Sequence, residues 1–300
     1  MTLEVREDEW VWACREGFES DLVAELRCGR ILEPGLVAAT RSEGMPTFGR
    51  QGFPVHACLP STRERCAPVI AQLAGDGPFA LHAWVPDTDA GNRCAQSANG
   101  LRAGALKLLP ALAARERAAT ELDSQASLVS ICLPRAETAW LGALPIHRAP
   151  SLWPGGKVLT KLPGRAPSRS AMKLAEAFSW LGFGPEANDR CVDLGAAPGG
   201  WTWLLLARGA RVFAVDRARM HESIARDPRL THVTESAFSW RPPKPVDWLL
   251  CDMVWKPSEV AALVARWGSA RLCRFVLANF KLPMKRRLEV VQSVRKTIAG

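Results

Sequence analysis

The sequence has no long apolar run. None of its segments reaches the roughly 18 to 20 apolar residues of a membrane-spanning helix. Its start is not typical of a signal peptide, because acidic residues stand where a basic and then apolar stretch would be needed: Glu4, Glu7, Asp8 and Glu9. We therefore expect a cytoplasmic protein with no membrane partner.

Cysteine and histidine patterns that hold metals are also absent. The nine cysteines are odd in number and include no Cys-x-x-Cys pair. Most stand in apolar stretches, so we expect buried free thiols rather than a zinc site or a disulfide framework. His56, His82 and His147 are isolated from other ligand types, and we expect packing or surface roles for them.

One charge sign dominates only half of the chain. The formal net charge is +9, but residues 1–150 sum to −3 and residues 151–300 to +12. A basic half of this kind favours a polyanionic partner, most simply a nucleic acid. The alternative is that the excess charge serves solubility alone.

The stretch 191–207 lacks both common phosphate-binding patterns. An apolar segment ends at Asp193-Leu194, a turn of small residues follows through Gly200, and an apolar helix pattern begins at Trp201. The glycine spacing is neither Gly-x-Gly-x-x-Gly nor that of a Walker loop. Glycines at such a turn let a ligand approach the backbone, so the turn suits an adenosine-like ligand without phosphates. S-adenosylmethionine (SAM) fits, and Asp193 would suit its cationic end.

The second half alternates strands and helices. Apolar runs predict strands at 191–194, 211–215, 246–251 and 273–279, and helical spacing predicts helices at 171–181, 201–208, 217–226, 258–267 and 286–298. This alternation predicts an α/β fold with a parallel, Rossmann-like sheet over 168–300.

The first half is irregular and predicts small α+β units. We expect strands at 10–14, 35–40, 54–59, 79–85 and 127–133, and helices at 19–28, 66–73 and 100–119, the last broken near Pro110. The predicted divisions are an α+β subdomain at 1–50, a second domain at 51–148 and a linker at 149–167 rich in Pro, Gly and Ala. Basic residues of the linker region either lie along a polyanion or are simply solvated: Lys157, Lys161, Arg165 and Arg169.

Charged side chains end the predicted parallel strands. Asp193, Asp216, Asp252 and Lys281 all fall at the carboxyl ends, where ligands bind in sheets of this kind. Asp216 follows the glycine turn at a distance typical of a ribose-binding carboxylate. Asp252 and Lys281 come from neighbouring strands and can meet. Lys173 lies on the helix before the first strand. Burial and a second nearby lysine would each lower a lysine pKa, while Asp252 opposes this, and a lysine lowered toward neutrality can act as a general base.

Several motifs resemble those of the FtsJ/RrmJ class of ribose 2'-O-methyltransferases. They are Ser168-Arg169-Ser170-Ala171-Met172-Lys173-Leu174, the glycine turn with Asp193 and Trp201, Leu250-Cys251-Asp252-Met253-Val254, and Asn279-Phe280-Lys281-Leu282-Pro283-Met284-Lys285. The last two resemble the RlmM-type family, which 2'-O-methylates a cytidine of 23S ribosomal RNA. Arg15-Glu16-Gly17-Phe18-Glu19 and the α+β character of 1–148 resemble that family's N-terminal half. The resemblance implies a ferredoxin-like, THUMP-type RNA-binding domain at residues 51–148 of this chain.

The resemblance implies roles for individual residues. Lys281 would accept the proton, with Asp252 and Lys173 as its partners in a Lys–Asp–Lys–Glu tetrad. Contacts to SAM would fall on these residues: Ser170, Ala197, Pro198, Gly199, Gly200, Asp216, Ser236 and Asp252. Ser236, with Glu235 beside it, stands where the family has an aspartate. The tetrad's glutamate and two sheet strands would follow Gly300, and Glu289 is on the wrong predicted element to replace it.

The main expectation is therefore a SAM-dependent 2'-O-methyltransferase acting on 23S rRNA. One alternative is an RNA-binding member of the same lineage, catalytically impaired without the glutamate region. Another alternative is a nicotinamide-dependent oxidoreductase on the same kind of sheet. The glycine spacing disfavours it, because it is not the Gly-x-Gly-x-x-Gly of a dinucleotide site. The oligomeric state is left open, although an unpaired sheet edge would favour self-association.

Overall fold

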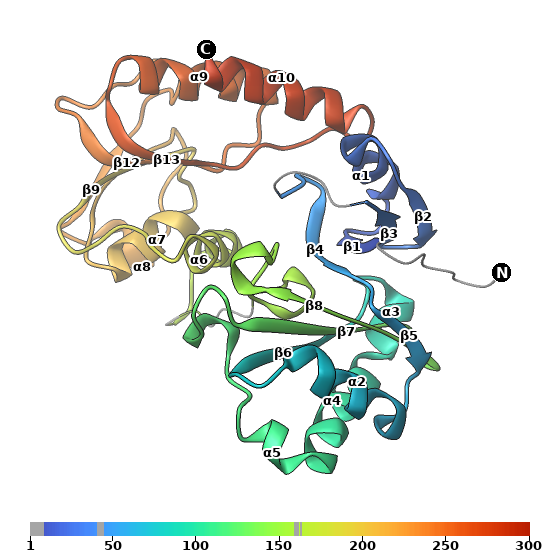
Figure 1. Cartoon of the computed structure of the whole chain (residues 1–300). Coiled ribbons are helices and arrows are strands. Elements are labelled where there is room, and N and C mark those ends of the chain that lie inside the picture. Colours follow the sequence, from blue (N-terminus) through green and yellow to red (C-terminus); the bar gives the residue numbers. More distant parts are fainter. Residues whose placement is uncertain (1–8, 41–44, 159–161, 163) are drawn as a thin grey trace. The chain divides into compact units, whose positions relative to one another are not determined.

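A computed structural model describes residues 9–40, 45–158, 162 and 164–300, and the chain forms two compact units, Met1–Val158 and Leu159–Gly300 (Figure 1). The expectations for Glu4, Glu7, Asp8 and Lys161 fall outside the described residues. Within these ranges no helix combines the length and the apolar character needed to cross a bilayer.

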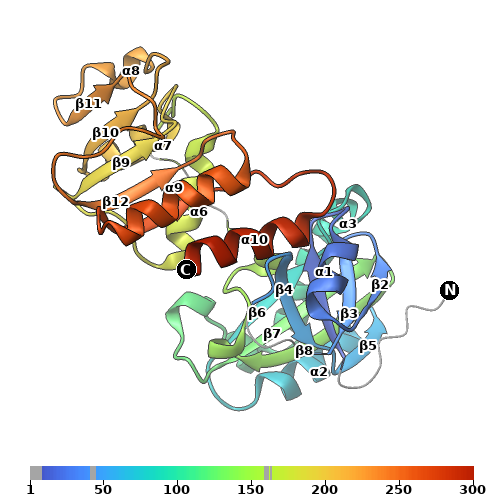
Figure 2. The ribbon, with the colours of Figure 1, turned by 90° about the horizontal axis from the view of Figure 1, so that it is seen from above.

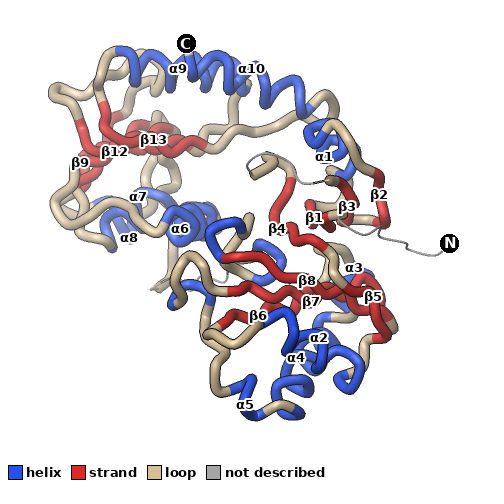
Figure 3. Tube along the Cα trace, in the orientation of Figure 1, coloured by secondary structure: helices blue, strands red, loops and turns tan. Residues whose placement is uncertain are grey.

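The first unit contains two four-stranded sheets, drawn as red strands in Figure 3. One has the order β2-β3-β1-β4 and is antiparallel, with helix α1 (Glu19–Leu26) against β2 and β3. Its strands are β1 (Trp10–Cys14), β2 (Arg30–Glu33), β3 (Leu36–Ala39) and β4 (Gly49–Pro54).

The second sheet of this unit has the order β5-β8-β7-β6, with β6 and β7 parallel and the other pairs antiparallel. Alternate β7 residues Val129, Ile131 and Leu133 pack against two long helices, α2 and α4. The elements are β5 (Ala57–Pro60), α2 (Arg63–Ala74), β6 (Phe79–Trp84), α3 (Asp89–Arg93), α4 (Ala95–Leu108), α5 (Pro110–Ala113), β7 (Ser127–Arg135) and β8 (Thr138–Pro145). Both faces of β7 are covered, so its sequence is almost continuously apolar.

The second unit is built on one parallel five-stranded sheet of order β11-β10-β9-β12-β13. Its strands are β9 (Arg190–Leu194), β10 (Arg211–Val215), β11 (Leu230–Val233), β12 (Val246–Cys251) and β13 (Cys273–Ala278). The chain proceeds outward from β9 to β11 and then returns to β12 on the other side of β9. The carboxyl ends of β9 and β12 therefore form the switch point at which such sheets bind ligands.

Helices cover both faces of this sheet (Figure 2). The helices of the unit are α6 (Ser170–Leu181), α7 (Gly200–Ala207), α8 (Glu222–Ala225), α9 (Pro257–Ser269) and α10 (Arg287–Ala299). Leu174 of α6 and Leu205 of α7 join one core with Leu250 of β12. Leu263 and Trp267 of α9 join the opposite core, and α10 lies along α9. The predicted α/β class is confirmed.

Several predicted elements are wrong in extent. The helix expected at 217–226 is a single turn, α8. The His221 N–H, which would bond within such a helix, donates instead to the Pro198 carbonyl at 2.9 Å. The helix expected at 100–119 starts earlier, at Ala95, and breaks after Leu108 next to Pro110 as expected, but it continues only as the single turn α5, which ends at Ala113. Four strands were missed, and they are short or half-exposed or carry polar and small residues: β2, β4, β8 and β11.

All nine cysteines are free thiols, but not all are buried. Five are buried, whereas Cys28 and Cys58 are exposed and Cys94 and Cys273 are half-buried. Among the described residues, no three His, Cys, Asp or Glu side chains come together as metal ligands.

Candidate functional site

The glycine turn follows β9 and leads directly into α7. Gly195 and Gly199 have φ values of 74° and 111°, a region that favours glycine. A Cβ at Gly195 would lie 2.4 Å from Met253 Cγ, and one at Gly199 would lie 2.3 Å from Ile224 Cδ1. The expected reason for these glycines was ligand approach. The structure shows that the missing side chains also make room for the protein's own residues, while Gly195 lines a cavity described below.

Asp193 lies beneath this turn rather than in front of it. Its side chain is buried and accepts a hydrogen bond from the Thr202 hydroxyl at 2.7 Å. Burial raises the pKa of Asp193 to about 7, the Thr202 hydrogen bond opposes that rise, and the nearby Asp252 and Asp216 charges add to it. The expectation that Asp193 faces the cationic end of a ligand is therefore wrong, since its carboxyl belongs to the core.

A cavity of about 510 Å³ opens at the carboxyl ends of β9, β10 and β12. Four of the predicted cofactor-binding residues line it: Ala197, Asp216, Ser236 and Asp252. The other residues that line it are Gly195, Val215, Arg217, Glu235, Ala237, Phe238, Met253, Val254 and Trp255. The remaining predicted contacts, Ser170, Pro198, Gly199 and Gly200, do not line this cavity.

Asp216 holds the turn in place. Its Oδ2 accepts a hydrogen bond from the Ala197 N–H at 3.0 Å, while its Oδ1 accepts one from Ala218. The carboxylate thus ties the glycine turn after β9 to the loop after β10, and it still faces the cavity. A carboxylate has further lone pairs beyond these two bonds, so a ribose hydroxyl can also bind there.

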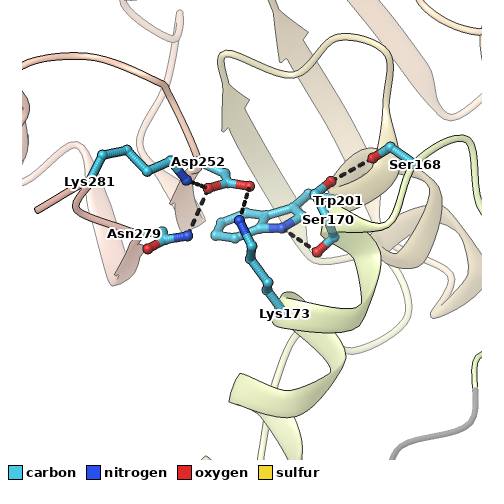
Figure 4. Close-up of polar contacts among 7 residues, drawn as sticks. All are labelled: Ser168, Ser170, Lys173, Trp201, Asp252, Asn279 and Lys281. Carbon is cyan, nitrogen blue, oxygen red and sulfur yellow. Dashed lines mark hydrogen bonds and ion pairs between the residues drawn. The ribbon is translucent and has the colours of Figure 1, made fainter. Parts of the chain in front are cut away.

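The start of α6 meets the start of α7 through two serines. The Ser168 and Ser170 hydroxyls lie 2.7 Å apart, and a Cβ at Gly200 would collide with both. The Trp201 indole N–H donates to the Ser170 carbonyl at 2.9 Å (Figure 4). Ser170 therefore fixes α6 against α7, and with it the helix that carries Lys173.

The three predicted catalytic side chains lie together, with Lys281 and Lys173 both at the carboxylate of Asp252 (Figure 4). Lys281 Nζ donates to Asp252 Oδ1, and Lys173 Nζ lies 3.6 Å from Asp252 Oδ2. The Asp252 side chain is 13% exposed, whereas Lys281 and Lys173 are 29% and 54% exposed. The Asp252 carboxylate is therefore largely buried where it lines the cavity, whereas the two lysines that contact it are partly exposed to solvent. Glu289 is elsewhere, on α10 in an ion pair with Arg286.

Sequence reasoning missed some residues of this site. Asn279 donates from its side-chain amide to Asp252 Oδ1 at 2.8 Å. Its place directly after an apolar strand was the available signal. Phe238 and Trp255 form an aromatic wall of the cavity with ring centroids 5.5 Å apart. No local pattern marks that pair, because the two rings come from separate loops.

Comparison with known proteins places these features in context. Residues 166–289 match the model of the FtsJ-like methyltransferase family. The "Ribosomal RNA large subunit methyltransferase M" of Thauera aminoaromatica is 36% identical over 324 residues, which cover 95% of this chain and 86% of that protein. The protein of the same name from Alkalilimnicola ehrlichii is also 36% identical, over 97% of this chain and 87% of its own length.

Among solved structures, TrmN from Thermus thermophilus matches with a TM-score of 0.30 at 15% sequence identity, over 95% of this chain and 91% of that one. A score this low supports no structural argument.

Proposed function

This chain belongs to the family of ribosomal RNA large subunit methyltransferase M, and on that premise we propose that it methylates a ribose 2'-hydroxyl of a cytidine in 23S rRNA with SAM as donor. The observation that carries the proposal is the contact of Lys281 with Asp252 beside the cavity. It supplies a proton acceptor where the sheet binds its ligand.

The cavity suits SAM by its chemistry. Its lining combines the carboxylates of Asp216, Glu235 and Asp252 with the rings of Phe238 and Trp255. Carboxylates suit ribose hydroxyls and positive charge, and aromatic faces suit an adenine ring or a cation. When bound, SAM supplies a methyl group on a sulfonium that leaves as a neutral thioether.

The lysine–aspartate cluster provides the acid–base chemistry. Lys281 as a neutral amine would accept the proton of the 2'-hydroxyl while bound SAM would supply the methyl group for that oxygen. Asp252 orients Lys281 through Oδ1 and balances the charge that the amine gains. Lys173 Nζ, 3.6 Å from Oδ2, places a second amine beside the same carboxylate.

Substrate binding is assigned to the basic half and to the first unit. Four basic residues at and after the catalytic loop would contact phosphates: Lys281, Lys285, Arg286 and Arg287. We assign RNA binding to a THUMP-like domain at 51–148, after a subdomain at 1–50 and before a linker at 149–167. The methyltransferase domain is then 168–300. Phosphate contacts of this kind position the RNA, and they make its binding salt-dependent.

The test is transfer of radiolabelled methyl from SAM to unmodified 23S rRNA by the full chain, followed by nuclease mapping. Label on the ribose of one cytidine is the expected result. Label on a base, or on no rRNA at all while SAM binds, would contradict the proposed reaction. The second of these outcomes would instead favour an RNA-binding protein of the same lineage. A control titration with NADH should show weaker binding than SAM, and tighter binding would contradict the choice of donor.

A further inference from the structure

Asn279 connects the sheet to the lysine–aspartate cluster. It follows the last residue of β13, and its backbone N–H donates to the Cys251 carbonyl at 2.8 Å. This bond extends the β12–β13 ladder beyond the pairing of Cys251 with Ala278. The sheet therefore fixes the main chain of Asn279. The loop that carries Lys281 starts immediately after this residue.

We propose that Asn279 is a positioning residue that fixes the Asp252 carboxylate so that one oxygen serves Lys281 and the other faces Lys173. This inference rests on the proposed function of the same site. The side-chain N–H of Asn279 reaches Asp252 Oδ1 at 2.8 Å, the same oxygen that Lys281 contacts (Figure 4). Asn279 does not line the cavity proposed for SAM, although it lines a second cavity with Lys173, and its side chain joins the cluster through the hydrogen bond to Asp252.

The lysines are poorly suited to orient this carboxylate themselves. Each has a long, flexible side chain, and more than a quarter of each is exposed, which leaves the ammonium groups rotational freedom. The amide of Asn279 is held by a short side chain on a backbone that the sheet anchors. With Oδ1 shared between Asn279 and Lys281, rotation of the Asp252 carboxylate would break both bonds at once.

The neutrality of the amide matters as much as its position. A hydrogen bond from an uncharged donor satisfies the partly buried carboxylate without adding a third cation to the cluster. A carboxylate at position 279 would instead repel Asp252 and stabilise the charged forms of both lysines. Asparagine therefore fills the hydrogen-bond site on Asp252 without adding either a third cation or a second carboxylate to the cluster.

The test compares Asn279→Asp and Asn279→Ala in the full chain. Both variants should lower kcat for methyl transfer about 10-fold or more, with KM for SAM changed less than 3-fold, since a hydrogen bond to a charged group is lost. Only Asn279→Asp should move the acidic limb of the pH–rate profile, upward by about one pH unit. The matched control is Asn188→Asp, the same chemical change at an exposed turn before β9, at the opposite end of that strand from the glycine turn, which should leave rate and profile unchanged.

A merely structural role would give another pattern. Both variants would then melt earlier and lose rate together, with no movement of the pH limb, and this result would overturn the inference. A second readout does not depend on activity: NMR titration of ¹³C-labelled lysine side chains, with Lys281→Arg identifying the resonance. The Lys281 titration should move to higher pH in Asn279→Asp and stay in place in Asn188→Asp. If the wild type transfers no methyl, the proposed function fails, and an unmoved Lys281 resonance overturns the positioning role separately.

Discussion

The Thr202 hydroxyl donates a 2.7 Å hydrogen bond to Asp193 Oδ2 in the core beneath the glycine turn. Thr202 is fully buried and Asp193 is 1% exposed. A carboxyl in such a place resists ionisation, and burial raises the pKa of Asp193 to about 7 from an ordinary value of 3.8. The pair thus places a titratable group directly behind the proposed SAM site.

We expect Asp193 to make the stability of the second unit depend on pH. The raised pKa means that the folded state holds this proton more tightly than the unfolded state does. The group therefore favours folding below about pH 4, and its contribution is lost as the pH rises through about 7. Relative to Asp193→Asn, the wild type should lose up to about 4 kcal/mol of unfolding free energy over that range. Urea unfolding of both proteins from pH 4.5 to 8 measures it, and parallel curves would contradict it.

Thr202→Val tests the hydrogen bond itself. Valine keeps the volume of the side chain but cannot donate to the carboxyl, and the bond favours the ionised form of Asp193. We expect a loss of about 1.5 to 3 kcal/mol at pH 8 and a smaller loss at pH 5, where the carboxyl is protonated. In the Asp193→Asn background, Thr202→Val should change the unfolding free energy equally at both pH values, because position 193 then has no carboxyl group to titrate. A loss of equal size at both pH values in the wild-type background would show that the hydroxyl does not bind the charged form.

Lys281 should be essential for the chemical step but not for SAM binding. We expect Lys281→Ala to lower kcat by about 100- to 10,000-fold, the usual contribution of a general base. Lys281→Arg should be nearly as impaired, because arginine keeps the charge but does not give up its proton. Isothermal titration with SAM should show less than a threefold change in affinity for either variant. Methyl transfer by Lys281→Ala at the wild-type rate would remove Lys281 from the proposed mechanism.

The aromatic wall of the cavity can be tested with two tryptophans of similar exposure. Trp255 is 52% exposed and lines the cavity beside Phe238, whereas Trp180 is 55% exposed on α6 and does not line it. We expect Trp255→Ala to weaken SAM binding about 5- to 10-fold, the range of one aromatic contact. Trp180→Ala should leave the affinity unchanged. Equal losses in both variants would mean that the effect does not come from the cavity wall.

The alternating second half was the part most open to prediction from sequence. Strand β9 and the glycine turn were recognisable because an apolar run ends abruptly in small residues. The meeting of Asp252 and Lys281 followed from parallel strands alone, since the carboxyl ends of neighbouring strands share one edge of the sheet. These predictions succeeded because each depends on strand direction rather than on packing detail.

Other features depend on tertiary contacts that no local pattern shows. Strand β11 is short, at the sheet edge and half-exposed, so its apolar signal is weak. The sequence places Asp193 at the end of a strand, which predicts a side chain that faces the ligand. It does not show that this side chain is buried beneath the turn. Asn279 was passed over because its value comes from the distance to one carboxylate, and that distance is set by the register of β12 and β13.

Asp216 should be required for SAM binding because it fixes the turn that forms one wall of the cavity. Asp216→Ala removes acceptors from the Ala197 and Ala218 N–H groups, and we expect a 10- to 100-fold loss of SAM affinity. The control is Asp227→Ala, which removes a carboxylate that also accepts from a backbone N–H, that of Arg229, but does not line the cavity. Isothermal titration with SAM, beside melting curves for both variants, separates the two effects. Equal affinity losses would mean that any loosened loop of this unit weakens binding. A loss confined to Asp216→Ala, with similar melting temperatures, would assign the effect to the cavity wall itself.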